Sequence, residues 1–163
     1  MQSDSDLQWF KVETGADADH LMDKVGGFHD GCIREFYSWT GHFVDESLSM
    51  HADPRANLRL LIQLQWKHMR AVELVFGGVA LLHWTPSPPE CSDDISDAWV
   101  VRHGDLWMWT DNWPEWNASS VCVQSRELWW RDASEWLGPT SRLGLVHGSP
   151  TLIPYVDFVP SQD

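Results

Sequence analysis

The stretch Leu58–Trp84, LRLLIQLQWKHMRAVELVFGGVALLHW, decides the fold. From Leu58 to Trp66 an apolar residue occupies every second position, which is the period of a half-buried β-strand and not the spacing of a helix. Lys67–Arg70 makes a short polar connection, and alternation resumes over Val72–Phe76. This spacing predicts a β-hairpin with a loop of about four residues.

Alternation extends on both sides of this hairpin. Gly77-Gly78 permits a sharp turn or a bulge, because glycine accepts a positive φ at little cost. The pattern predicts further strands over Phe28–Thr40, Ser47–His51, Val79–Trp84, Asp97–His103, Asp105–Trp109 and Val121–Trp130.

These segments predict a mainly β chain, α+β at the margin, organised as one antiparallel meander of about seven or eight strands. We expect the sheet to be strongly curved or to form a partly open barrel. A short N-terminal helix is predicted over Asp17–Val25, capped by Asp17 and ended by Gly26-Gly27. Residues 1–163 are predicted to form a single domain, with 1–16 and 137–163 as peripheral segments.

The charge of the chain restricts its partners. The formal net charge is −13 and the isoelectric point is near 4.8, which argues against binding to nucleic acid or to anionic membranes. A basic protein partner would instead be attracted at a salt-dependent rate.

Tryptophan is the most unusual part of the composition, with 12 residues among 163. Trp favours strands and its buried N–H needs a partner, so large rings filling a β core are one interpretation. The other is an aromatic platform for a ligand.

The cysteines and the N-terminal residues indicate a location. Cys32, Cys91 and Cys122 are odd in number and widely spaced, so neither a disulfide framework nor a zinc ribbon is predicted. Cys32 and Cys122 fall in apolar strands, where a thiol is expected to be inert core. Since neither a signal peptide nor a long apolar run is seen, we expect a cytoplasmic protein without a membrane span.

No catalytic signature appears in the sequence, and we expect neither enzymatic activity nor a cofactor or bound metal. His29-Asp30 has the residue types of a metal-dependent hydrolase, which would also use His51, but such chemistry needs further ligands. His42, Asp45, Glu46, His51 and Asp53 are a second inventory of metal ligands without helical or H-x-H spacing.

Acidic and aromatic residues mix on predicted loops, at Asp105, Asp111, Trp113, Glu115 and Trp116. A Trp patch rimmed by carboxylates has the composition of a hot spot for a basic protein. In the alternative interpretation Trp113 and Trp116 fold over the core as a lid.

A small-ligand site is an alternative. A curved sheet could enclose a Trp-lined cavity with His29, Asp30, Tyr37 and His51 as polar contacts.

Five segments resemble a family of small, uncharacterised bacterial proteins. They are Phe28-His29-Asp30-Gly31-Cys32-Ile33, Ser47–His51, Leu60–Trp66 with its Q-x-Q-W end, Val72–Val79, and the hairpin Asp97–Trp109. The resemblance covers roughly residues 28–112 and implies a shared fold without an assigned chemistry.

By analogy, small acidic β-rich proteins of this kind resemble the immunity proteins of bacterial toxin systems. We therefore expect a non-enzymatic, immunity-type inhibitor of a basic bacterial toxin domain. The small-ligand binder and the metal-dependent hydrolase are the alternatives, and the oligomeric state stays open.

Overall fold

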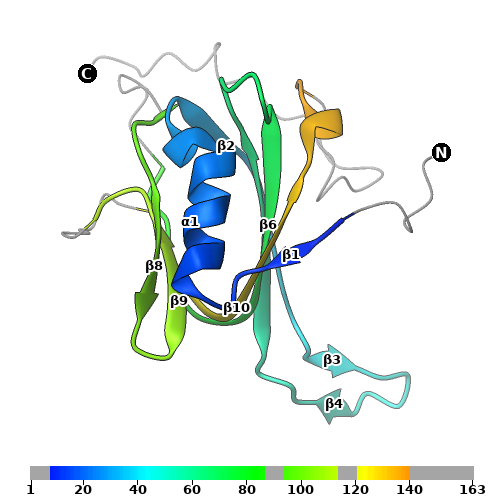
Figure 1. Cartoon of the computed structure of the whole chain (residues 1–163). Helices are drawn as coiled ribbons and strands as arrows, with labels where there is room; N and C mark the ends of the chain where they lie inside the picture. The colour runs from blue at the N-terminus through cyan, green and yellow to red at the C-terminus, as the bar shows by residue number, and fades with distance from the viewer. Residues whose placement is uncertain (1–7, 87–93, 114–120, 140–163) are drawn as a thin grey trace, which may run out of the picture.

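A large antiparallel β-sheet carries one helix on one of its faces (Figure 1). The computed structural model describes residues 8–86, 94–113 and 121–139. The helical segments are α1 (Gly15–Lys24), η2 (Gly26–Phe28) and η3 (Ser134–Trp136). The strands are β1 (Phe10–Lys11), β2 (Gly31–Thr40), β3 (Phe43–Val44), β4 (Met50–His51), β5 (Ala56–Gln63), β6 (Ala71–His83), β7 (Asp94–Ile95), β8 (Trp99–His103), β9 (Leu106–Thr110) and β10 (Cys122–Asp132).

The strand order confirms the antiparallel, mainly β prediction and refines its topology. The large sheet runs β7-β2-β5-β6-β10-β9-β8, and β1 adds to β10. The sheet has two halves, β2-β5-β6 and β10-β9-β8, and the long strands β6 and β10 pair with each other where the halves meet. The strand order therefore differs from the sequence order, and the sheet is not a simple meander. The sheet is not closed and curves only weakly, so the expected strong curvature and partly open barrel are not found.

The central hairpin forms as predicted, with different ends. β5 stops at Gln63 because the chain turns there, and Leu64 N donates to Arg70 O at 2.8 Å. Gly78, with φ +61°, makes an irregularity inside β6 and not the end of a strand, so β6 continues to His83. Val79–His83 pairs with β10 alone, whereas Ala71–Gly77 lies between β5 and β10.

Helix α1 begins earlier than the sequence indicates. Thr14, not Asp17, is the N-cap: the Thr14 hydroxyl accepts from Asp17 N, and the Asp17 carboxylate accepts from Thr14 N at 2.8 Å. This reciprocal capping box lowers the pKa of Asp17, and the hydrogen bond between the Thr14 hydroxyl and the Asp17 carboxylate is the largest cause. In the described ranges no helix combines the length and the apolar character needed to cross a bilayer.

The main core lies between α1 and the sheet. Leu21 and Val25 pack there against alternating residues of β5, β6 and β10, and Phe28 meets Trp109 edge to face at 5.7 Å. Trp107, Trp109 and Trp130 are buried in this layer, which confirms the core interpretation for these three rings.

A bulge in β2 changes which of its side chains share a face. The register shifts between Ile33 and Glu35, so that Ile33 pairs with Ile62 and Phe36 with Leu60. Ile33 and Phe36 both pack against the core, whereas strict two-residue alternation over the strand predicted at Phe28–Thr40 would place them on opposite faces. Cys32 is exposed, and the expectation of a core thiol is wrong for it; Cys122 is buried, and burial raises its thiol pKa.

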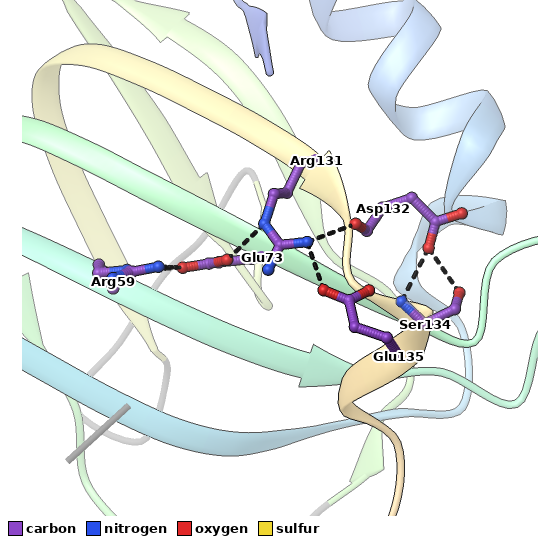
Figure 2. Close-up of polar contacts among 6 residues, drawn as sticks. All are labelled: Arg59, Glu73, Arg131, Asp132, Ser134 and Glu135. Atoms are coloured by element: carbon purple, nitrogen blue, oxygen red, sulfur yellow. Dashed lines mark hydrogen bonds and ion pairs between the residues drawn. The ribbon is translucent and has the colours of Figure 1, made fainter. Parts of the chain in front are cut away.

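The opposite face of the sheet holds a buried ion cluster that spans three strands (Figure 2). The Glu73 carboxylate, 0% exposed, accepts from Arg59 Nε at 2.6 Å and from Arg131 Nε at 2.7 Å. Arg131, 2% exposed, also donates to Glu135 at 2.6 Å. Its guanidinium lies near the rings of Trp9 and Trp136, 5.6 and 4.9 Å from their centroids. Both oxygens of a fully buried carboxylate are therefore compensated.

We expect Glu73→Ala to lower the free energy of unfolding by roughly 3–5 kcal/mol, because it leaves the buried Arg131 guanidinium without its main counter-ion. Glu135→Ala is the matched control; its carboxylate is 43% exposed, and we expect a loss of about 1 kcal/mol or less. Urea unfolding followed by Trp fluorescence measures both. Equal losses for the two variants would contradict a dominant role of Glu73.

Candidate partner-binding site

The β3–β4 hairpin stands apart from the large sheet, at the lower right of Figure 1. It links β2 to β5 and forms a separate two-stranded sheet, with Phe43 opposite His51 and Val44 opposite Met50. The predicted strand over Ser47–His51 is reduced to its last two residues, because the preceding three belong to the hairpin loop.

A single carboxylate organises the loop. Asp45 Oδ1 accepts from Ser47 N at 2.9 Å and from Ser49 N at 3.0 Å, and Oδ2 accepts from His51 Nε2 at 2.6 Å. These bonds, the one from His51 first, lower the pKa of Asp45 to about 2. An isolated two-stranded hairpin is only marginally stable in water. The charge-assisted hydrogen bonds of Asp45 therefore order this loop in place of a buried core.

Apolar side chains of the hairpin face the solvent. Phe43 and Val44 are 58% and 57% exposed, Met50 is 74% exposed and Leu48 at the tip is 86% exposed. Phe43 stacks on His51, with ring centroids 4.4 Å apart and planes 8° apart. Val44 and Met50 form the neighbouring cross-strand pair, and because successive strand residues point to opposite faces, they lie on the other side of the hairpin from Phe43. Four large exposed apolar side chains on one short hairpin make it a candidate interaction element.

Leu48 also carries backbone strain. Its φ is +63°, a left-handed conformation that costs a side-chain-bearing residue about 1–2 kcal/mol. Glycine or asparagine is the usual residue at such a position. Leu48 keeps this conformation within the hairpin turn, where its N–H donates to Asp45 O, and its side chain gains no burial in return.

The base of the hairpin is fixed by a second ion pair. Arg55 Nε donates to the Asp53 carboxylate at 2.8 and 3.0 Å, and this bond is the first cause that lowers the Asp53 pKa to about 2. Gly41 N donates to Arg55 O, and Asp53 N donates to His42 Nδ1. A Cβ on Gly41 would lie 2.4 Å from the Asp53 carboxyl carbon, so a side chain there would displace the Asp53 carboxylate from its place beside Arg55.

The structure describes three of the five residues of the acidic-aromatic patch predicted from the sequence, Asp105, Asp111 and Trp113. Asp105 lies in the β8–β9 turn and Asp111 beyond the other end of β9, about 20 Å away at the rise of a strand. Trp113 is exposed beyond Asp111, and Glu115 and Trp116 lie outside the described residues. Asp105 and Asp111 therefore lie at opposite ends of β9.

Asp111 has a local structural role. Its Oδ1 accepts from Val121 N at 2.8 Å, which ties the start of β10 to the end of β9. Desolvation is the largest influence on this carboxyl and raises its pKa.

The residues of the predicted small-ligand site are also spread out. His29 and Asp30 lie before β2, where His29 Nδ1 bonds Ser96 O and Asp30 has φ +55°. Tyr37 is eight residues beyond His29, roughly 20 Å or more along the strand, and stacks on Trp39. His51 belongs to the hairpin.

The metal alternatives find no support in the geometry. Asp45 and His51 meet, but as an isolated pair within the loop network. Across the described ranges, no three or more His, Cys, Asp or Glu residues gather as a group that could hold a metal ion.

The hairpin surface was not predicted, although the sequence contains a signal for its loop. In Asp45-Glu46-Ser47-Leu48-Ser49, a carboxylate precedes two serines at the spacing of a side-chain-capped loop.

The chain matches no protein-family model, no curated protein and no solved structure.

The Asp45 network should be visible in its pH dependence. The folded pKa of about 2 is below the ordinary value of 3.8, so the order that it confers is present above pH 4 and is lost as the pH falls through 2. We expect the amide NMR signals of Ser47 and Ser49 to shift in acid with a midpoint near pH 2, where Asp45 takes up its proton.

Asp45→Asn should abolish this low-pH transition. Asp53→Asn is the matched control, because Asp53 has a similarly lowered pKa but bonds Arg55 instead of the loop. A transition that persists in Asp45→Asn, or that disappears only in Asp53→Asn, would contradict the assignment.

Proposed function

We propose that this chain is a non-enzymatic binding protein whose β3–β4 hairpin inserts into a basic protein partner. The observation that carries the proposal is the strained, 86% exposed Leu48 on a loop ordered by Asp45. Because this loop is already ordered in the free protein, less conformational entropy is lost when it binds a partner.

Charge complementarity favours a basic partner. The chain has a net charge of −13, and Glu46 lies exposed beside Leu48 on the hairpin. Long-range attraction would accelerate the encounter, and the apolar tip would then hold the complex. This combination of charge for attraction and apolar contact for affinity is what an immunity-type inhibitor of a cationic toxin domain would need.

The partner test uses a basic protein encoded beside the gene of this chain, purified as a separate domain. Surface plasmon resonance should show saturable binding whose association rate falls steeply between low and physiological salt, with the dissociation rate changing less. Co-expression should also relieve any growth inhibition that the basic protein causes. Binding without salt dependence would contradict the electrostatic part of the proposal.

Leu48→Gly tests the hairpin itself. Glycine accepts the positive φ, so the loop should keep its fold while it loses the apolar contact. We expect binding to weaken by about tenfold to 100-fold, mainly through faster dissociation. Leu82→Gly, which removes a 44% exposed leucine from β6, is the control and should bind like the wild type. Unchanged binding by Leu48→Gly would remove the hairpin from the interface.

A further inference from the structure

An open groove of about 790 Å³ lies beside the base of the hairpin. It forms where β6 continues past the start of β5, so that the β5 side of Val79–His83 has no paired strand in the described part of the chain. Its lining includes Trp39, Arg55, Asn57, Gly78, Arg126 and Glu127. Trp39 is the only tryptophan among them, so this is not the Trp-lined cavity expected from the sequence.

The groove carries one uncompensated positive charge. Arg55 is paired with Asp53, and Glu127 is paired with Lys11 at 3.4 Å. Arg126 has no carboxylate partner among the described residues. Since the other charged side chains of the lining are paired, the Arg126 guanidinium is the group in this groove that can receive an anion, among the residues that the structure describes.

Two further groups could orient a ligand. Trp39, 36% exposed, stacks on Tyr37 with ring centroids 5.4 Å apart, and this contact holds its ring as a platform. The Asn57 Oδ1 atom accepts from Gly78 N at 3.3 Å, which leaves the Asn57 amide N–H groups available as donors.

The glycine backbone positions the cation. A Cβ on Gly78 would lie 3.3–3.4 Å from the Arg126 stem, so the arginine chain rests directly over the glycine. A side chain at position 78 would have to displace it, and the φ of +61° disfavours one in any case.

We propose that this groove binds a carboxylate carried next to an aromatic ring, with the ring against Trp39 and the carboxylate between Arg126 and the Asn57 amide. A free aromatic acid and the C-terminal aromatic residue of a peptide both present this chemistry. The site is independent of the hairpin contact, since neither Leu48 nor Met50 lines it.

Titrations of the ¹⁵N-labelled full chain distinguish the two sources. The first arm uses indole-3-acetate against its uncharged amide, and the second uses acetyl-Gly-Gly-Trp with a free against an amidated C-terminus. In at least one arm we expect the acid to bind about tenfold or more tightly than its amide and to shift the signals of Asn57, Gly78 and the Trp39 indole. Acid-selective binding in one arm identifies the ligand as a free aromatic acid or as a peptide C-terminus. Binding in both arms shows that the groove recognises an aromatic ring with a carboxylate, whichever molecule carries it.

Arg126→Gln should reduce the affinity for the acid to that for the amide, whereas Trp39→Leu should weaken both. Arg102→Gln, at an arginine on β8 that stacks on Trp107 and does not line the groove, should bind like the wild type. The proposal fails if no acid gives saturable shifts up to about 10 mM, if acids and amides bind equally, or if Arg126→Gln leaves the preference unchanged.

Discussion

The structure depends on the buried carboxylate of Glu73 and its two arginines. Arg59, Glu73 and Arg131 belong to three adjacent strands, β5, β6 and β10, so their contacts specify the register of the centre of the sheet. A slip by one residue would turn Glu73 into the apolar layer beneath α1, where no counter-charge lies opposite it in the ladder. Hydrophobic alternation selects the face, and the ion cluster selects one register on that face.

The sequence predicted the parts of the fold that depend on two-residue alternation. It located the central hairpin, β8–β9 and β10, because each has one face in the core. It indicated a turn or bulge at Gly77-Gly78, where Gly78 has a positive φ inside β6, but it did not locate the bulge at Arg34, since an extra residue reverses the alternation without changing composition. Nor did it identify the buried Glu73: an acidic residue at an alternate strand position indicates solvent, and only the pairing with β10 brings Arg131 beside it.

The candidate site was less predictable for a related reason. Composition pointed to Asp105 and Asp111, but β9 lies between them and separates them by its full length. The hairpin surface was misread as one strand, because Leu48 and Met50 fit an alternating pattern. Both residues are exposed because none of the described elements packs over this two-stranded sheet, which is a tertiary property that local spacing does not encode.

An exposed apolar hairpin is a hazard unless self-association is limited. β3 and β4 are two residues each, which offers little backbone for edge-to-edge pairing. The outer edge of β2 is interrupted by its bulge, and a net charge of −13 makes copies of the chain repel one another. A cationic partner experiences the opposite force at the same surface. The same negative charge would thus repel other copies of the chain from the apolar tip and attract a basic protein to it. The hairpin can therefore discriminate between these partners while it stays exposed.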